Sequence, residues 1–380
     1  MIVGIDGSNL RTGGGTTHLR NLLACAEPGR HGIERVIVWT SQATLGLLPA
    51  LDWLEPVHEP WLDRSLPWRL LWQWFRLPSL AREHCDVLFS PGGNSPSGFA
   101  PLVTMSRNML PFEYHELFRY GLSRTTLRLL LLRFGQSRTF RRADGLIFLT
   151  DYAREAVQRV SRARGRVAVI PHGVEERFRN EPRPQRALAE CSAEHPLRLL
   201  YVSIVDLYKH QWHVAEAVDR LRREGLPVEI DFVGPAYSPA EKRLRSELER
   251  RDPEGRFLHY RGPIPFQELH ELHQTADVFV FASSCENMPN ILLEAMASGY
   301  PIACARRGPM PEILGEAGVY FDPERPEEIA DALRAFVLDA ALRSRCAAAA
   351  YELAQRYSWK RCAEETLAFV ERIGRPDAPA

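Results

Sequence analysis

The chain has 380 residues, which is too many for one ordinary hydrophobic core and suits two α/β domains. Hydrophobic residues make up 45% and charged residues 25%, a composition typical of soluble globular proteins. The 48 basic and 48 acidic side chains cancel, so the net charge neither favours nor excludes nucleic acid as a partner, and only local clusters of charge can decide.

The cysteines and the first residues bear on the compartment. Seven scattered cysteines form no Cys-x-x-Cys pair and no Cys/His cluster with metal-ligand spacing, which favours a reducing, cytoplasmic compartment. Met1–Asp6 is typical of a strand and not of a signal peptide. Apolar runs such as Leu129–Leu132 are far too short to span a bilayer. We therefore expect a cytoplasmic protein whose only membrane contact would be peripheral, on the inner face of the cell membrane.

In the first half of the chain, short apolar runs alternate with helical patterns. The helical patterns include Thr16–Ala26 and Tyr152–Ser161. Such alternation favours a parallel sheet covered by helices on both faces. The expected strands are Ile2–Ile5, Val36–Trp39, Val87–Ser90, Leu102–Met105 and Leu146–Leu149.

A second series of the same kind follows a linker. Glu175–Pro196 has several prolines, many charges and little apolar periodicity, which is typical of a linker. The expected strands after it are Leu197–Ser203, Val228–Val233, Phe257–Tyr260, Val278–Ala282, Pro301–Ala305 and Val319–Phe321. The expected helices are Gln211–Glu224, Pro239–Arg251, Phe266–Thr275, Ile291–Ser298, Pro326–Asp339 and a last one around Trp359–Ile373. We place the domains at 1–171 and 172–355, followed by the last helix and a short tail in 356–380.

A polar loop between a strand and a helix carries the strongest functional signal. After Val278–Ala282 the chain reads Ser-Ser-Cys-Glu-Asn-Met-Pro-Asn and opens a helix near Asn290. The free N–H groups and the dipole of such a helix start attract anions. Glu286 in the loop and Glu294 about one turn into the helix could each accept two hydrogen bonds from the vicinal hydroxyls of a ribose or hexose. The structural alternative is an amphipathic helix with two solvated carboxylates.

This motif resembles the signature of the family-4 retaining glycosyltransferases of the GT-B fold. In that family two glutamates eight positions apart flank a Gly/Pro/Asn loop, and Glu-Ala-Met-Ala-x-Gly-x-Pro follows, as it does here. The resemblance implies that Glu286 touches the donor sugar as a catalytic residue and that Glu294 binds the nucleotide ribose. It further implies that the loop contacts the donor through Asn287, Met288, Pro289 and Asn290. The family usually has Gly-Phe where this chain has Asn287-Met288, a change that could reshape the sugar pocket.

A second loop resembles the phosphate clamp of the same family, Gly-Arg-x-x-x-x-Lys-Gly. Lys209 matches the Lys, so we expect it to bind the donor diphosphate and to act in catalysis. Ile204 stands where the family has Arg, and the missing charge could come from Arg306, Arg307 or a backbone N–H. The alternative for Lys209 is a solvated surface lysine, the commonest fate of that residue.

Further matches follow the order of the family along the chain. Three successive glycines after the first strand let the backbone approach a ligand closely, and by resemblance Gly14 and Gly15 face the donor phosphates. Gly262 and Ile264 lie where backbone of the family meets the nucleotide base. Gly308–Ile313 resembles a loop near the donor, and Pro171–Val174 resembles the hinge of the family.

The first domain offers a weaker catalytic signal and a clearer basic one. Asn108 stands in a segment where the family often reads His-Asp-x-x-Pro, so it could bond the donor sugar or the acceptor but cannot act as a base, while His115 and Glu113 lie nearby. Trp61–Arg82 and Leu117–Ala143 combine aromatic residues or leucines with many arginines. Such helices suit an anionic membrane surface, although a solvated face over core leucines remains an equal alternative.

The resemblance as a whole implies a GT-B protein made of two Rossmann-like α/β domains. The first would bind the acceptor, the second the donor, and the last helix would pack back toward the first. The expected reaction is metal-independent, configuration-retaining transfer from a UDP- or GDP-sugar to a glycan or lipid-linked glycan in cell-surface polysaccharide synthesis, such as that of lipopolysaccharide. Lys209 and helix N-termini would replace a metal, so no cofactor and no nucleic acid is expected. The alternatives are a sugar-nucleotide epimerase of the same fold and a non-catalytic nucleotide-sugar-binding protein.

Overall fold

The computed structural model describes residues 1–11, 13–272 and 274–375, which form two compact units. Unit 1 comprises Met1–Gly173 and the chain from Tyr357 onward, and unit 2 comprises Val174–Arg356. The units therefore join at residues 173 and 356, where the sequence predicts boundaries after 171 and 355. Of the tail expected at the end of the chain, residues 376–380 lie outside the described residues. Within the described residues no helix is long and apolar enough to cross a bilayer.

The sheet of unit 1 is parallel, with the strand order β3-β2-β1-β4-β5-β6-β7. Its central strands consist almost wholly of buried residues, which is why they appear in the sequence as continuous apolar runs. Strands β3 and β7 form the edges, and their mixed, half-exposed residues give no such run. The strands are β1 (Ile2–Asp6), β2 (Arg35–Thr40), β3 (Leu54–His58), β4 (Val87–Ser90), β5 (Leu102–Met105), β6 (Gly145–Phe148) and β7 (Arg166–Val169).

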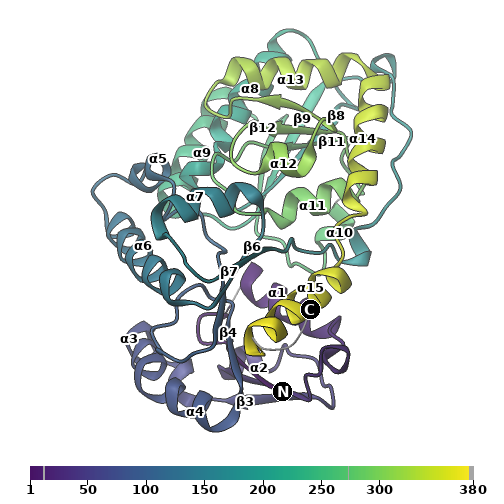
Figure 1. Ribbon diagram of the computed structural model, residues 1–380. Helices are drawn as coiled ribbons and strands as arrows, with labels where there is room; N and C mark the ends of the chain where they lie inside the picture. The colour runs from purple at the N-terminus through teal and green to yellow at the C-terminus, as the bar shows by residue number, and fades with distance from the viewer. Residues whose placement is uncertain (12, 273, 376–380) are drawn as a thin grey trace. The chain divides into compact units, whose positions relative to one another are not determined.

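Helices and short turns cover this sheet (Figure 1). The α-helices are α1 (Gly14–Ala24), α2 (Gln42–Leu45), α3 (Leu66–Leu71), α4 (Leu77–His84), α5 (Tyr114–Phe118), α6 (Arg124–Arg142), α7 (Asp151–Ser161) and α15 (Trp359–Gly374). The short turns are η1 (Pro28–His31), η2 (Pro60–Asp63) and the π-turn η3 (Trp72–Arg76). The C-terminal helix α15 packs on α1 and against β4, β5 and β6, so it completes unit 1. Gly145 allows this contact, because a Cβ there would lie 2.9 Å from atoms of Phe369 and Ile373.

The segment from α3 through η3 to α4 is one helical run interrupted by a π-turn. Pro78 lies at the start of α4, where its ring has no N–H to bond the preceding turn and would clash with the carbonyl of Trp74. A π-turn widens the helix just before that point. The result is that Trp72 is fully buried in the core, whereas Trp74 and Phe75 are 59% and 70% exposed.

The sheet of unit 2 is also parallel, with the order β10-β9-β8-β11-β12-β13. Its strands are β8 (Leu197–Val202), β9 (Val228–Val233), β10 (Leu258–Gly262), β11 (Val278–Phe281), β12 (Ile302–Ala305) and β13 (Gly318–Phe321). Its helices are α8 (Gln211–Arg223), α9 (Ser238–Arg251), α10 (Leu269–Leu272), α11 (Asn290–Ala297), α12 (Met310–Leu314), α13 (Pro326–Leu338) and α14 (Ala340–Ala354), with the 3₁₀ turns η4 (Glu176–Phe178), η5 (Leu188–Glu190) and η6 (Leu207–Lys209). Helix α8 packs against α9 and α13, and α11 packs against α14 (Figure 1).

One expected helix of unit 2 is much shorter than predicted. The sequence predicts a helix over 266–275, but α10 covers only Leu269–Leu272, and residue 273 lies outside the described residues. Phe266 does not enter the helix. Its ring centre lies 6.0 Å from that of Phe178, and the Arg177 guanidinium lies 4.2 Å from it. Phe266, whose apolar side chain suggested a longer helix, therefore packs on Phe178 and Arg177 instead.

Both sheets reverse their strand order at one place. In unit 1 the strand β1 has β2 on one side and β4 on the other, and in unit 2 the strand β8 has β9 and β11. Connections leave such a pair of strands in opposite directions, which opens a crevice at their carboxyl ends. Ligands of open α/β sheets bind in that crevice. The fold thus singles out the loops after β1 and β4 and the loops after β8 and β11.

Candidate functional site

In unit 2 the loop after β8 is a tight turn that presents Lys209. The Asp206 carboxylate accepts a hydrogen bond of 2.6 Å from the N–H of Leu207 and so begins turn η6. The Tyr201 hydroxyl donates to the carbonyl of Lys209 at 2.6 Å, and His210 then adopts a left-handed backbone with φ of 53°. These contacts fix the backbone that carries the lysine.

Lys209 and Glu286 meet at the point where the strand order reverses. The ammonium of Lys209, which follows β8, pairs with the carboxylate of Glu286, which follows β11. Only 6% of Lys209 is exposed, and its Nζ lies 5.0 Å and 5.1 Å from the ring centres of Tyr208 and Phe281. Lys209 is therefore not a solvated surface lysine. Because an ammonium has three N–H donors, it can hold Glu286 and a second anion together.

Ser284 ties these two loops together. Its backbone N–H donates to the carbonyl of Tyr208 at 2.8 Å, and its hydroxyl donates to the same carbonyl at 3.2 Å. A ring nitrogen of His210 lies 3.0 Å from the same hydroxyl. The loops after β8 and β11 are thus fastened to each other, and the ion pair sits on a rigid support.

Helix α11 begins where the sequence predicts it, directly after the loop of Glu286. Pro289 precedes Asn290, and no side chain caps the helix. The loop before it is buried, with Asn287 and Met288 each 6% exposed. The buried side-chain oxygen of Asn290 has no hydrogen-bond partner among the described residues. Polar groups of this kind, buried beside a helix N-terminus, are suited to a polar or anionic ligand.

Glu294 lies in the second turn of α11 and is almost fully buried. Its Oε2 has no hydrogen-bond partner among the described residues. Burial raises the pKa of Glu294 to about 8; the nearby Glu175 raises it further and Arg177 lowers it. A buried carboxyl group without a partner is costly, and such groups cluster at functional sites. The structure therefore excludes the alternative of a solvated carboxylate at this position.

The expected base-binding residues lie at the end of β10, two strands away from β8. Gly262 has φ of 73°, open space stands where its Cβ would be, and its carbonyl accepts from the N–H of Gly234 at 2.8 Å. Gly234 in turn lies against the residue that follows β8, because a Cβ there would lie 2.1 Å from the carbonyl oxygen of Ser203. Ile264 is partly exposed just beyond. The carboxyl ends of these three strands thus form one continuous edge.

Arg306 and Arg307, which could supply the charge missing at Ile204, both have partners further along this edge. The Arg307 guanidinium pairs with Asp322 at 2.7 Å. The Arg306 guanidinium lies 5.7 Å from the ring centre of Tyr320. Ile204 itself is 39% exposed after β8. The structure therefore pairs Lys209 with Glu286. The two arginines instead contact Tyr320 on β13 and Asp322 directly after it.

In unit 1 the glycine turn after β1 starts helix α1. Gly13 has φ of 71° with open space around its Cβ position, and no side chain caps the helix. Arg107 holds this turn from the neighbouring loop after β5, donating to the carbonyl of Gly14 at 2.6 Å and to that of Gly15 at 3.3 Å. Burial lowers the pKa of Arg107 to about 10, so the guanidinium stays charged at neutral pH. The sequence does not predict these two hydrogen bonds, because they join residues far apart in the chain.

The residues near Arg107 that the sequence offers for catalysis have local contacts. The Asn108 side-chain oxygen accepts from the N–H of Leu110 at 3.1 Å and stabilises its own turn. Glu113 accepts from the Tyr152 hydroxyl. His115 is exposed, 3.6 Å from the carboxylate of Glu116. Asn108 thus lies beside the arginine that holds the glycine turn, whereas His115 lies on the surface.

A buried histidine pair that the sequence does not predict involves α1, the helix that follows the same turn. The Nδ1 atoms of His18 on α1 and His172 are 2.9 Å apart, although the residues are 154 positions apart in the chain. Burial, followed by the charge of Arg107, lowers the pKa of both rings well below the usual value. Both are therefore neutral, and one ring donates to the other. The Trp359 ring packs against both.

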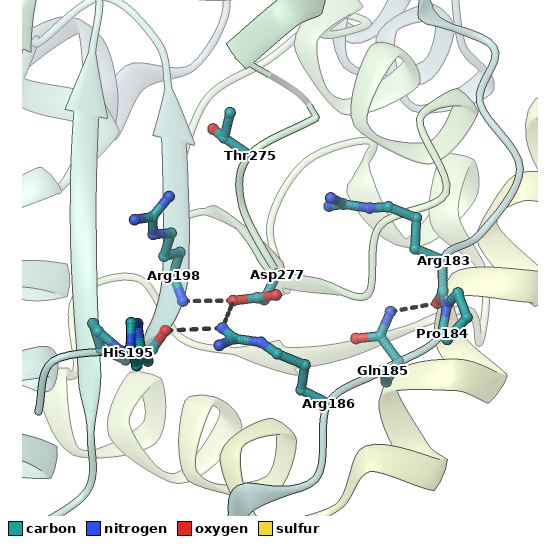
Figure 2. Close-up of a pocket in the computed structure, with 9 residues that line it drawn as sticks. Arg183, Pro184, Gln185, Arg186, His195, Arg198, Thr275 and Asp277 are labelled. Atoms are coloured by element: carbon teal, nitrogen blue, oxygen red, sulfur yellow. Dashed lines mark hydrogen bonds and ion pairs between the residues drawn. The ribbon is translucent and has the colours of Figure 1, made fainter. Parts of the chain in front are cut away.

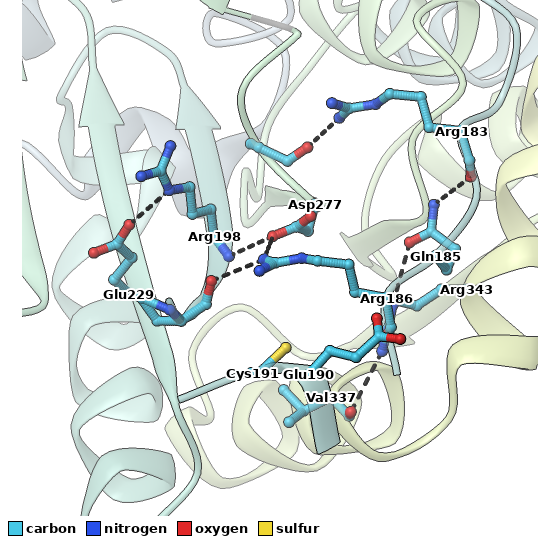
Figure 3. Close-up of polar contacts among 12 residues, drawn as sticks. Arg183, Gln185, Arg186, Glu190, Cys191, Arg198, Glu229, Asp277, Val337 and Arg343 are labelled. Carbon is cyan, nitrogen blue, oxygen red and sulfur yellow. Dashed lines mark hydrogen bonds and ion pairs between the residues drawn. The ribbon is translucent and has the colours of Figure 1, made fainter. Parts of the chain in front are cut away.

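Unit 2 also has a polar pocket of about 350 Å³ at the opposite edge of its sheet, near the amino ends of β8 and β11 (Figure 2). Arg186 and Asp277 point toward one another across it and pair at 2.5 Å, and Asp277 also accepts from the N–H of Arg198 at 2.9 Å. Behind it the buried Arg343 donates to the side chain of Gln185 at 3.2 Å (Figure 3). These contacts fasten the linker expected over 175–196, so we interpret the pocket as structural.

Two models of protein families match the chain. Residues 189–353 match the family described as "Glycosyl transferases group 1", and residues 12–178 match "Glycosyltransferase Family 4". Among curated proteins, the O-antigen chain mannosyltransferase B of Escherichia coli is 31% identical over 120 residues, which are 32% of this chain and 31% of that protein. The D-inositol 3-phosphate glycosyltransferase of a Nocardioides species is 28% identical over 254 residues, 63% of this chain and 56% of that protein. The chain thus spans 31% and 56% of the length of these two relatives.

Solved structures resemble the chain over almost its whole length. WaaG, a glycosyltransferase involved in lipopolysaccharide biosynthesis, has a TM-score of 0.68 at 16% identity, with 97% of this chain and 99% of that chain covered. HepE from Anabaena in complex with UDP-glucose has a TM-score of 0.68 at 17% identity, with 97% and 99% covered. At such identities the likeness establishes the fold.

Proposed function

Because the chain belongs to the group 1, family-4 glycosyltransferases of the GT-B fold, we propose that it transfers a sugar from a nucleoside-diphosphate sugar to a glycan or lipid-linked glycan. The observation that carries this proposal is the buried pair of Lys209 and Glu286 where the strand order of unit 2 reverses. A cation beside a carboxylate suits a sugar diphosphate, since Lys209 can bind the phosphates while Glu286 accepts from sugar hydroxyls.

The remaining donor contacts are assigned along the same edge. Glu294 would meet the ribose, Asn287–Asn290 and the N-terminus of α11 would line the sugar and phosphates, and Gly262 and Ile264 would meet the base. For Gly14, Gly15 and Asn108 of unit 1, a role in donor binding or catalysis stays a prediction from the resemblance. The UDP-glucose complex of HepE, which shares the fold, supports a UDP-sugar as the first donor to test.

We propose that the transfer retains the configuration at the anomeric carbon. The bond from that carbon to the diphosphate breaks, the acceptor oxygen bonds to the same face, and the acceptor proton passes to the departing phosphate oxygen. Glu286 supports this route because Lys209 already holds it, which leaves it poorly placed as a free nucleophile. Lys209 and the start of α11 would stabilise the charge that grows on the leaving group, so no metal is required.

A lipid-linked acceptor in cell-surface polysaccharide synthesis would explain the surface of unit 1. Large apolar side chains are exposed along α3, η3 and α6, among them Phe134 at 68% and Leu131 at 65%. The O-antigen and lipopolysaccharide enzymes among the similar proteins support this class of acceptor. Each arginine near an anionic bilayer adds about 1 kcal/mol of binding, which salt screens.

Two experiments test the proposal. Incubation with UDP- and GDP-sugars and a membrane extract should release the nucleoside diphosphate, and NMR of the product should show the anomeric configuration of the donor. Donor binding without release would favour the non-catalytic alternative, and a changed sugar on the nucleotide would favour an epimerase. Flotation with anionic and neutral liposomes at low and high salt tests the membrane. A protein that does not float with either kind of liposome at either salt concentration would point to a soluble acceptor.

A further inference from the structure

Unit 1 contains an apolar cavity that the reaction does not account for. It has a volume of about 760 Å³ and lies between α3, η3, the loop after β4 and α6. Leu71, Trp74, Phe75 and Phe134 give it apolar walls. Its volume is within the range of about 300–1,000 Å³ that is usual for ligand pockets.

Hydrogen bonds hold the walls of this cavity together. The side-chain amide of Gln73 in η3 donates to the carbonyl of Asn94 at 3.1 Å. The N–H of Ser95 donates to the hydroxyl of Thr139 on α6 at 3.1 Å. Both walls are thereby tied to the same loop, so the cavity is preformed and does not depend on a chance gap between helices.

A glycine inside a helix keeps the cavity in this shape. Gly135 lies in the middle of α6, where glycine is about 1 kcal/mol less favourable than alanine. A Cβ at Gly135 would lie 2.9 Å from the side-chain oxygen of Asn94. Glycine at this position therefore lets α6 lie close to Asn94 in the cavity wall. The π-turn that exposes Trp74 and Phe75 forms the opposite wall, and such turns are frequent at functional sites.

The rim of the cavity is positively charged. Arg138 and Arg142, one turn apart on α6, both line it and are exposed. Neither has a carboxylate partner among the described residues. Helix α6 contains no Asp or Glu to neutralise them. An apolar cavity beside two free guanidiniums is complementary to a molecule with a hydrocarbon chain and an anionic headgroup.

We propose that this cavity binds one hydrocarbon chain of a phosphate-bearing lipid, with Arg138 and Arg142 at the phosphate. The inference rests on the peripheral membrane contact suggested above and makes it specific. A single lipid would leave its chain partly out of the bilayer and anchor unit 1 through a defined pocket. Unit 1 would then be held at the membrane by a stoichiometric ligand as well as by its exposed apolar surface.

Calorimetry with monomeric alkyl phosphates of increasing chain length tests the cavity directly on the full chain. Each CH₂ that enters should strengthen binding about fourfold, or about 0.8 kcal/mol, up to the length that fills the cavity, at one ligand per chain. Alkyl glucosides of the same length should bind more weakly. Arg138→Gln and Arg142→Gln should each weaken the phosphate about fivefold and leave the glucoside unchanged.

Variants of the wall separate the cavity from the surface around it. Leu71→Asp and Phe134→Asp place a charge in the lining at side chains that are 38% and 68% exposed, so the fold should tolerate them. Both should abolish the dependence on chain length. Leu131→Asp is the matched control, since Leu131 is exposed on the same helix but does not line the cavity. It should keep that dependence.

Either of two patterns of alkyl phosphate binding would overturn the proposal: affinity that does not depend on chain length, and a Leu71→Asp or Phe134→Asp variant that binds like the unmodified chain. The proposed function fails separately. Donor turnover by Leu71→Asp, measured without lipid, reports on the glycosyltransferase site alone. Normal flotation on anionic liposomes without binding of alkyl phosphates would refute the cavity but leave the membrane contact standing.

Discussion

Glu294 offers the sharpest test of the donor site, because its burial has a measurable cost. Replacing it with Gln removes a carboxyl group whose pKa rises from 4.5 to about 8 in the folded chain. At about 1.4 kcal/mol for each tenfold change in the ionisation constant, ionising this group inside the fold costs on the order of 5 kcal/mol at most.

The direction of the pH effect follows from the sign of that change. A raised pKa means that the folded chain binds the proton more tightly than the unfolded chain, so the cost is absent below pH 4.5 and grows until about pH 8. Glu294→Gln stays neutral throughout. The variant should therefore gain stability relative to the natural chain as the pH rises through this window, and the gain should level off above it.

Nucleotide binding should change in the opposite direction. If the ionised Glu294 bonds the ribose hydroxyls, loss of that charged hydrogen bond should weaken binding above about pH 8 by about 1.5–3 kcal/mol, or about tenfold to a hundredfold, because the carboxyl group of the folded chain is largely protonated below that pH. Urea unfolding from pH 4.5 to 9 measures the first effect and calorimetry with UDP and GDP the second. Glu316→Gln, at an exposed glutamate of unit 2, is the control and should change neither.

The two measurements separate the burial of Glu294 from its role in nucleotide binding. A variant that is more stable at high pH but binds nucleotide normally would show that Glu294 is buried for another reason. A variant without any pH-dependent gain would show that the carboxyl group is solvated or paired, which would contradict its burial.

Three further substitutions and one chelation experiment test the other parts of the proposed site. Lys209→Ala should lower turnover at saturating donor about a hundredfold or more, measured as release of nucleoside diphosphate, whereas the exposed Lys242→Ala should not. Arg107→Ala removes two hydrogen bonds to the glycine turn, so it should lower the melting temperature and raise the KM for the donor. An unchanged KM would show that the turn has no role in donor binding. Ile204→Arg should tighten binding of the diphosphate about tenfold if this position faces the phosphates, and Leu338→Arg, far along α13, should not. Turnover should survive excess EDTA, and its loss would implicate a metal.

The sequence predicts those parts of the fold whose residues are buried on both faces. The runs that become β4, β5, β11 and β12 are continuous because helices cover both sides, so their signal is strong. The edge strand β3 carries Pro56, and only its first residue, Leu54, is buried, so nothing in its local pattern separates it from a loop. The helix expected over 266–275 shows the reverse error, since Phe266 packs on Phe178.

The candidate site divides in the same way. Loops that follow buried strands locate Lys209, Glu286 and Glu294, because a strand, a polar loop and a helix start are visible in order along the chain. Contacts between distant segments are invisible there. The hold of Arg107 on the glycine turn and the pairing of His18 with His172 depend on how strands β1 and β5 and the end of β7 come together in the sheet, not on any local pattern.

The sheets of the two units reverse their strand order in the same way, but the charges at the two reversals differ. Where the order of unit 2 reverses, a lysine with a spare donor meets a carboxylate, so that crevice can hold both the charge of a diphosphate and the hydroxyls of a sugar. Where the order of unit 1 reverses, Arg107 donates to the carbonyls of the glycine turn, and the nearby His18 and His172 are neutral. The first N–H groups of α1 have no side chain to cap them. Under the proposed function, unit 2 would therefore bind the charged donor, and unit 1, with its arginine-rich helices, would bind the acceptor.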